Sequence, residues 1–298
     1  GEPDVITAWR TAPGHHARGA FNPREIETIR REMLPSLPCE PAEIGIISPY
    51  NEQVNALHRE LGGGIDVATV HKFQGREKEA IILSTVDDQI TAFTDDPNLL
   101  NVAVSRAKRQ FTLVTSSNEQ PDSRNIADLL AYIDYNGGKI TESAIHSVFD
   151  LLYEPYAEAR REFLKRHRRI SEFDSENLTY ALLERVLEAD PAFRHLGVLC
   201  HQPLRQLIRD WTILDDEERR YALNGATHLD FLIYNRVSKR PVLAIETDGY
   251  QFHKQGTRQS ERDRMKDRIL DRYSLPLLRL STTGTDEEAK IHTLLKRN

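Results

Sequence analysis

The residues best suited to chemistry are two carboxylates near the carboxyl-terminal end of the chain, Asp230 and Glu246. They lie in two β-rich runs, HLDFLIY and VLAIETDG, joined by the turn-forming stretch NRVSKRP. A hairpin symmetric about Ser238 places Asp230 opposite Glu246, with Cβ atoms about 4.5–5.5 Å apart, and alternation puts Asp248 on the face of Glu246. Two facing acids repel, so the pattern predicts a site for a hard cation, Mg²⁺ or Mn²⁺. Such an ion can bind a phosphate, supply hydroxide and neutralise developing charge, which is the chemistry of phosphodiester cleavage.

The region around this hairpin, 171–281, resembles the PD-(D/E)XK nuclease superfamily, in particular the branch near the very-short-patch repair endonucleases with an IExDG…H strand. The resemblance implies a restriction-endonuclease-like α/β domain with a mixed sheet. In it Glu176 is the helical acid, and Asp230 and Glu246 are the acids of the second and third strands. These three carboxylates would be the metal ligands, and His253 matches the histidine that often follows the third strand.

One position departs from the superfamily pattern, in which a lysine follows the third-strand acid by two residues. This chain has Asp248 there. A relocated lysine is a known solution in the superfamily, and Lys266, in the helical stretch RQSERDRMKDRILDRY, is the first candidate, with Lys254 second. Lys266 could instead only pair with neighbouring aspartates. The expected catalytic set is therefore Asp230, Glu246, Asp248 and Lys266, and the alternative is a nuclease-like fold that binds DNA or a partner protein without cleaving.

A second group of polar clusters stands beside short apolar runs in the first half of the chain. There VATVHKFQGREKEAIILSTV is followed by NLLNVAVSRAKRQFTLV. These stretches resemble motifs V and VI of superfamily 1 helicases, and SPYNEQV upstream resembles motif IV, which implies a second RecA-like motor domain. By that resemblance, motif IV places Tyr50 and Gln53 near the nucleotide. Motif V would contribute two contacts to a single-strand phosphate and three nucleotide-binding residues: Thr69 and His71, then Gln74, Gly75 and Glu77.

Motif VI carries Arg106, which the resemblance makes the arginine finger and therefore a catalytic residue. Phosphoryl transfer is catalysed mainly by positioning and by neutralising charge on the transferred group, and a planar guanidinium suits this better than an ammonium. The alternative is that Arg106 and Lys108 form a solvated helix face and that Gln74-Gly75 is a simple turn.

The chain lacks the phosphate-binding loop that a complete motor needs. Its Gly138-Lys139 pair is followed by Ile140, and no glycine stands five positions before Gly138, so GxxxxGK[ST] is absent. We expect this chain alone not to hydrolyse ATP. A first helicase domain before Gly1 is the expected partner, and it would supply ATP-Mg binding in a full-length protein. The start on glycine rather than methionine agrees with a fragment or an expression remnant.

A dense basic run, EARREFLKRHRRISE, follows this half of the chain. Between a DNA motor and a second domain it can follow a phosphate backbone, which makes DNA with a single-stranded portion the expected partner. The alternative is an ordinary solvated helix face. The charges concerned are Arg160, Arg161, Lys165, Arg166, Arg168 and Arg169.

Alternating strand and helix patterns predict an α/β fold with a mostly parallel sheet in the first domain. Ligands of such sheets bind outside the carboxyl ends of the strands, where SPYNEQ, TVHKFQGRE and Asn101–Arg106 are expected. Strands are predicted at 43–48, 65–70, 80–86, 111–115 and 277–280, and helices at 26–34, at 51–61 with Asn51 as cap, at 175–187 with Ser175 as cap, and from Asp286. A turn signal at Asn136-Gly137-Gly138 gives three expected parts: 1–137 as motor domain, 138–170 as helical basic connector, and 171–298 as nuclease-like domain.

Composition sets the outer limits. With 298 residues, 39% hydrophobic and 29% charged, the chain is long enough for two domains with their own cores. A net charge of -6 means that DNA contacts must come from local basic patches. No apolar run approaches the roughly 18 residues of a membrane helix and no signal peptide is present, so a cytoplasmic location without a membrane partner is expected. Cys39 and Cys200 lie far apart, which indicates neither a zinc site nor a disulfide framework.

Overall fold

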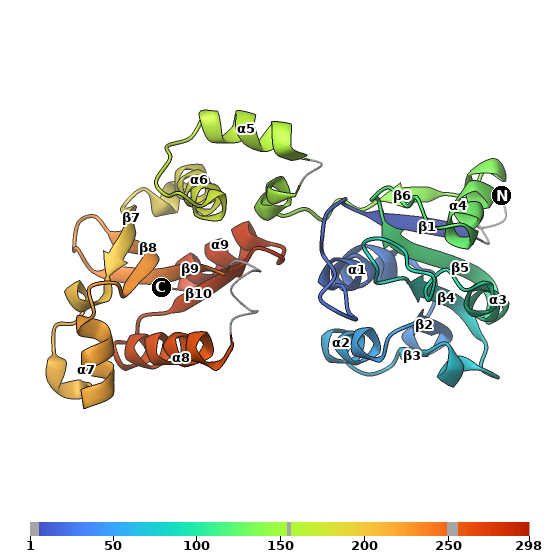
Figure 1. Ribbon diagram of the computed structural model, residues 1–298, viewed down its shortest axis with the longest axis horizontal. Helices are drawn as coiled ribbons and strands as arrows, with labels where there is room; N and C mark the ends of the chain where they lie inside the picture. The colour runs from blue at the N-terminus through green and yellow to red at the C-terminus, as the bar shows by residue number, and fades with distance from the viewer. Residues whose placement is uncertain (1–5, 154–155, 249–255, 298) are drawn as a thin grey trace. The chain divides into compact units, whose positions relative to one another are not determined.

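The computed structural model describes residues 6–153, 156–248 and 256–297, with backbone only for 256–260. The chain forms two compact units, Gly1–His146 and Ser147–Asn298 (Figure 1). Each unit has its own sheet and its own hydrophobic clusters. The expected α/β class is confirmed, with a RecA-like parallel sheet first and a mixed sheet second.

The first unit is built on a six-stranded sheet in the order β3-β2-β4-β5-β1-β6, in which every described pair of strands is parallel. The interior strand β2, with the sequence IGIIS, is buried at every position, as both faces of a parallel sheet are covered. The strands are β1 Ile6–Thr11, β2 Ile44–Ser48, β3 Asp66–Thr69, β4 Lys78–Ser84, β5 Ala107–Ser116 and β6 Ile140–Glu142.

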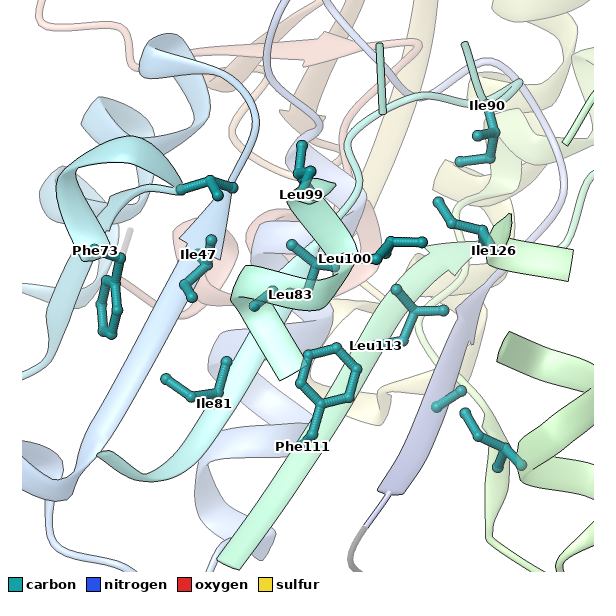
Figure 2. Close-up of a cluster of buried hydrophobic side chains, with 14 of the residues drawn as sticks. Ile47, Phe73, Ile81, Leu83, Ile90, Leu99, Leu100, Phe111, Leu113 and Ile126 are labelled. Carbon is teal, nitrogen blue, oxygen red and sulfur yellow. The ribbon is translucent and has the colours of Figure 1, made fainter. Parts of the chain in front are cut away.

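Alternation along β4 directs successive side chains to opposite faces of this sheet. Ile81 packs in one cluster with Leu99 and Ile126, and Figure 2 shows this cluster gathered along the strands. Ile82 packs in a second cluster with Leu57. The helices that supply these contacts are α1 Pro23–Thr28, α2 Asn51–Leu61, α3 Pro97–Ser105 and α4 Asn125–Tyr135.

The second unit has a four-stranded sheet in the order β10-β9-β8-β7. The pairs β7–β8 and β8–β9 are antiparallel, and β9–β10 is parallel. Phe231 packs with Leu183 and Ile291 on one face, whereas Leu232 packs with Ile269 on the other. The strands are β7 Leu196–Pro203, β8 His228–Asn235, β9 Pro241–Asp248 and β10 Leu277–Ser281, and the helices are α5 Ala157–Lys165, α6 Asp174–Ala189, α7 Asp216–Leu223, α8 Gly256–Arg272 and α9 Glu287–Arg297.

Three helix starts and ends differ from the sequence prediction. The helix expected at 26–34 begins earlier, because Asn22 caps α1 by accepting backbone hydrogen bonds, and it passes into a π-helical turn at Ile29–Met33. Asn51 is the first residue of α2 rather than its cap. Ser175 lies inside α6, which starts at Asp174 without a side-chain cap.

Three strands, β1, β6 and β7, were not predicted, and β6 affects the domain boundary. The polar and apolar residues of β1 are mixed, yet it pairs with β5 on one side and β6 on the other. Since β6 falls at the start of the predicted connector 138–170, that segment begins inside the first sheet. The division into units comes after His146 instead of after Gly137. Within the described residues, no helix is long and apolar enough to cross a bilayer.

Candidate functional site

The hairpin of the second unit has the predicted register from Phe231 to Ile233, and the pairing shifts by one residue at Tyr234. Phe231 pairs with Ile245, the last pair of the β8–β9 ladder, and Asp230 and Glu246 are the next residues along the two strands. Oδ2 of Asp230 accepts a hydrogen bond from the Thr247 backbone N–H at 2.8 Å. Neighbouring strands thus bring the two carboxylates together.

The carboxylates open into a pocket of about 380 Å³ where β8 begins and β9 ends. Its walls come from α6, the segment from α7 to β8, the end of β9, and α8. Every second-domain residue that the sequence assigned to catalysis or metal binding, within the described part of the chain, lines it. The lining side chains include Glu176, Tyr221, His228, Asp230, Glu246, Thr247, Asp248, Arg262, Asp263 and Lys266.

Lys266 lies against Glu246 rather than pairing with aspartates. Its Nζ donates to Oε2 of Glu246 at 2.6 Å and to the His228 carbonyl at 2.9 Å. Both side chains are withdrawn from water, 11% and 9% exposed. Burial raises the pKa of Glu246 to about 7; the Lys266 cation opposes this rise, and Asp230 adds to it. Lys266, the first candidate for the relocated lysine, therefore lies on α8 beside Asp230 and Glu246.

Asp248 has a different environment. Nη1 of Arg279, on the neighbouring strand β10, lies 3.5 Å from Oδ1 of Asp248. The same guanidinium pairs with Asp263 and Asp267 of α8. Asp248 occupies the usual place of the lysine in the sequence, while a positive charge reaches the pocket from Lys266.

Glu176 reaches the pocket from the first turn of α6. The hydroxyls of Thr179 and Thr247, 3.0 Å apart, fix this helix to β9. Oε2 of Glu176 and Oε1 of Glu246 are buried, and neither has a hydrogen-bond partner in the described structure. Buried carboxylate oxygens without donors are costly, so Oε1 of Glu246 is an acceptor open to a ligand or cation. Oε2 of Glu176 lies 3.6 Å from Nε2 of His201.

The arrangement only partly fits the predicted metal set of Glu176, Asp230 and Glu246. Among residues 6–153, 156–248 and 256–297, no three His, Cys, Asp or Glu side chains lie close enough to hold one ion. Lys266 takes one oxygen of Glu246, and the Thr247 N–H takes one oxygen of Asp230. Mg²⁺ is usually bound through one or two carboxylates with water and phosphate oxygens completing its shell. The pair Asp230 and Glu246 meets this smaller requirement, and the triad is not assembled.

Two histidines near the pocket were not singled out from the sequence. His228 lines the pocket, and the ring of His201 lies edge-on to it with centroids 5.6 Å apart. Strand alternation offered a signal for His228, two residues before Asp230. No pattern marked His201. The predicted positions His253 and Lys254 lie outside the described residues.

The motif residues of the first unit divide between two edges of its sheet. Gln74, Gly75 and Glu77 come just before β4, and Arg106 comes just before β5. Since the strands are parallel, these segments lie at the amino edge, and the Lys78 N–H donates to the Arg106 carbonyl at 3.0 Å. The expectation that they lie at the carboxyl edge is corrected, because residues that precede a strand cannot lie where it ends.

Arg106 is only lightly engaged by the chain. Its Nη2 donates to Ser105 Oγ at 3.2 Å, and its Nε is buried without a hydrogen-bond partner among the described residues. Gly75 has φ 78°, which favours glycine, and an added Cβ there would meet nothing within 4 Å. Donors and open space are thus available at the amino edge.

Tyr50, Thr69 and His71 lie at or beyond the ends of β2 and β3. The Tyr50 hydroxyl donates to Asp87 at 2.9 Å, and its ring centroid is 5.4 Å from that of Phe93. Thr69 is buried and His71 is exposed. Of this group, His71 and the Tyr50–Phe93 pair are accessible to a ligand.

Gln53, in contrast, is part of the fold. Its side chain is fully buried; Nε2 donates to Ser84 Oγ, and Oε1 accepts from the Asn22 N–H, each at 2.8 Å. An amide engaged at both ends and closed to solvent cannot meet a nucleotide without breaking these bonds. The predicted nucleotide contact of Gln53 is therefore replaced by a structural role.

The predicted DNA contacts of the basic run line a groove of about 400 Å³ between α5 and the start of α6: Arg160, Arg161, Lys165 and Arg168. Two carbonyls of the preceding turn hold Arg160. Arg161 and Lys165 each pair with a glutamate three residues earlier. Arg168 has no hydrogen bond or ion pair within the described part of the chain, so it is the freest of the four.

Two family profiles match separate parts of the chain. Residues 9–118 match an AAA domain family, and residues 173–297 match a family described as a protein of unknown function, DUF2726. The first match falls within the first unit and the second within the second unit.

Similar proteins include several helicases. An uncharacterized ATP-dependent helicase of Methanocaldococcus jannaschii is 39% identical over 101 residues, which are 33% of this chain and 15% of that protein. The DNA polymerase alpha-associated DNA helicase A of Saccharomyces cerevisiae is 40% identical over 104 residues, 32% of this chain and 15% of that protein. The DNA replication ATP-dependent helicase/nuclease DNA2 of Gallus gallus is 39% identical over 84 residues, 26% of this chain and 8% of that protein. The chain thus spans no more than 15% of the length of these relatives. Together with the AAA domain match, these relatives show that part of this chain is similar to helicases.

Proposed function

We propose that this chain is the carboxyl-terminal part of a DNA helicase-nuclease. The first unit provides half of an ATP site, and the second unit is a Mg²⁺- or Mn²⁺-dependent phosphodiesterase that cleaves DNA. The observation that carries the nuclease part is the meeting of Asp230, Glu246 and Lys266, from three separate elements, in one pocket. The AAA domain match and the helicase relatives support the motor part.

The pocket residues divide the chemistry among them. Asp230 and Glu246 hold the divalent ion, and Glu176 adds a third acid to the rim. The bound ion would bind the scissile phosphate, lower the pKa of a water ligand and neutralise developing charge. Lys266 orients Glu246 and brings a positive charge to the phosphate, while Arg279 neutralises Asp248.

A cleavage assay tests this assignment. The chain is incubated with single-stranded, duplex and flapped DNA in Mg²⁺ or Mn²⁺, beside the variants Asp230→Asn and Glu246→Gln. Both variants should lose cleavage. Asp271→Asn is the matched control, because Asp271 is an exposed acid on the helix of Lys266 that does not line the pocket. Cleavage that persists in both pocket variants would assign the activity elsewhere.

The first unit contributes Arg106 as arginine finger to an ATP site that it shares with a first helicase domain. Gln74, Gly75 and Glu77, at the same edge of the sheet as Arg106, supply nucleotide contacts in this proposal. Tyr50 lies beyond the end of β2, at the opposite edge, and is not among them. The open donors of Arg106 and the free space at Gly75 support these roles. ATP-Mg would bind only when the partner domain provides the phosphate-binding loop.

DNA with a single-stranded portion is the proposed substrate of both units. His71, which is exposed, would meet a strand phosphate in the first unit, whereas Thr69 is buried; the basic groove would meet one in the second. Reversing three groove charges, with Arg161→Glu, Lys165→Glu and Arg168→Glu together, should weaken single-strand binding and flatten its salt dependence. Unchanged binding would remove the groove from the proposal.

A second candidate is a nuclease-like unit that grips DNA without cutting it. Three observations favour it: the three-acid cluster is not assembled, burial raises the pKa of Glu246 to about 7, and Asp248 stands in the lysine position. DNA binding without metal-dependent cleavage would select this candidate.

A further inference from the structure

His201 stands in a row with the two acids of the proposed nuclease pocket. Cys200 of β7 pairs with Phe231 of β8, and the register continues unchanged beyond it, so the next position, His201, faces Asp230. Glu246 follows on the other side of Asp230. The three residues therefore occupy adjacent positions across three strands.

The backbone of His201 turns its ring out of this row. Val198 and Cys200 pack toward the cluster of α6, so regular alternation would direct His201 to the opposite face. Its φ of 50° is instead left-handed, which costs free energy for any residue with a Cβ. Nε2 of His201 lies 3.6 Å from Oε2 of Glu176 on α6 and 3.3 Å from the Ile170 carbonyl. The strained residue thus brings its imidazole to α6.

Glu176 has little else to hold it. Its Oε2 is buried without a hydrogen-bond partner among the described residues, and its side chain is 16% exposed. The ring of His201 also contacts that of His228, whose carbonyl accepts from Lys266. His201 therefore touches two residues of the pocket wall.

We propose that His201 is a positioning residue that holds the Glu176 carboxylate toward the pocket. This inference rests on the proposed nuclease function and adds a residue to it. Backbone strain is retained where the surrounding structure requires it, and it clusters at functional sites. The role explains why a β-strand keeps a left-handed histidine.

The test uses His201→Gly, which removes the ring and relieves the strained φ. Ser274→Gly is the control, because Ser274 is exposed, has the same φ of 50° and lies outside the pocket. We expect His201→Gly to lower kcat of DNA cleavage about tenfold or more, as loss of an outer-shell partner does, with KM for DNA unchanged. Both glycine variants should keep or raise the melting temperature. His201→Asn, which tolerates the left-handed backbone and keeps an N–H donor, should recover part of the rate.

Two further measurements separate positioning from a merely structural role. In the metal-free protein, Glu176→Gln should shift the NMR ring resonances of His201, and Ser274→Gly should not. His201→Gly should weaken Mn²⁺ binding, followed by electron paramagnetic resonance, as much as Glu176→Gln does, and the double variant should be no weaker than Glu176→Gln alone.

The outcomes distinguish the role of His201 from the proposed nuclease function. A wild-type chain that neither cleaves DNA nor binds Mn²⁺ overturns both. Wild-type cleavage with His201→Gly unimpaired, or with additive losses in the double variant, overturns the role of His201 alone.

Discussion

Glu25 of the first unit and Glu246 of the second are both buried beside a sheet, but their carboxyl oxygens are satisfied in opposite ways. Glu25, fully buried in the first unit, accepts hydrogen bonds from two hydroxyls and a backbone N–H at the end of β4. Glu246 of the second unit is paired with Lys266 and keeps one buried oxygen without a donor. A carboxylate with its acceptors filled belongs to the fold, whereas one left open beside a cation can take a ligand.

The two units also differ in where the residues of their sequence motifs lie. The first unit presents its open groups in connecting segments, with Arg106 as the clearest case. The second unit gathers its groups from strands and helices into one pocket. In the proposed function, the first arrangement needs a partner domain to complete an ATP site, and the second contains its own site.

The largest expected effect concerns Arg106 in a protein that contains both helicase domains. Arg106→Ala should lower ATP turnover by about 10³-fold or more, because an arginine finger stabilises charge in the transition state. Steady-state ATPase assays measure this, with Arg109→Ala, an exposed neighbour on β5, as control. Equal ATP turnover in Arg106→Ala and Arg109→Ala would mean that the Arg106 guanidinium does not act in catalysis.

The comparison of the two glutamates is tested directly by matched substitutions. Glu246→Gln should reduce metal-dependent DNA cleavage by about 10²–10³-fold, because it removes a charged group from the site. Glu25→Gln should leave cleavage within about twofold of wild type, since Glu25 lies in the other unit. Equal losses of cleavage in Glu246→Gln and Glu25→Gln would contradict the comparison. They would mean that an open acceptor does not distinguish a functional glutamate from a structural one.

Removing the positive charge of Lys266 should lower the stability of the second unit. Lys266→Met leaves Glu246 buried and unpaired, which we expect to lower the free energy of unfolding by about 3–5 kcal/mol. Adding Glu246→Gln should restore part of the loss. Urea titration followed by the fluorescence of Trp211, the second unit's tryptophan, in a Trp9→Phe background measures both. An unchanged midpoint in Lys266→Met would show that the pair contributes nothing to the fold.

The pH dependence of stability should reveal Glu25. Burial raises its pKa from 4.5 to about 8, with the hydrogen bonds of Ser84 opposing the rise. As pH increases, the unfolded chain releases this proton first, so the stability that Glu25 contributes is complete below about pH 4.5 and is lost by about pH 8. Urea midpoints of Trp9 fluorescence in a Trp211→Phe background should fall over this range. Glu25→Gln cannot ionise and should flatten the profile; an equally steep profile would assign the effect to other groups.

The smallest effect is expected at Arg168. Removing one phosphate contact should reduce the salt slope of single-strand binding by about 0.7 and the affinity a few-fold. Fluorescence anisotropy at several salt concentrations compares Arg168→Gln with Arg185→Gln, whose arginine pairs with Glu288 outside the groove. Identical slopes for the two variants would count against a DNA contact there.

Much of the second unit's site could be read from local patterns. The hairpin signal fixed the register that sets Asp230 across from Glu246, since side chains in a strand pair alternate with a fixed period. The helical period of α8 offered Lys266 as a candidate. The packing of α6 beside the pocket could not be predicted from the sequence, because helix packing depends on contacts between residues far apart in the chain.

The first unit shows where family patterns stop. They identified the polar segments but not the separation of those segments between two sheet edges, and they gave Gln53 a nucleotide contact that its buried hydrogen bonds preclude. Burial of an amide is a property of the assembled core and leaves no mark on local sequence.

The sequence by itself determined the α/β class, the strand pairing at the acid pair and the residue types available for chemistry. Only the tertiary structure decided which partners these groups have. Lys266 donates to one oxygen of Glu246, Arg279 pairs with Asp248, and the left-handed backbone of His201 brings its ring to Glu176. The physical reason is that periodicity sets the direction of a side chain along its own element. Its partners are set by how separate elements pack.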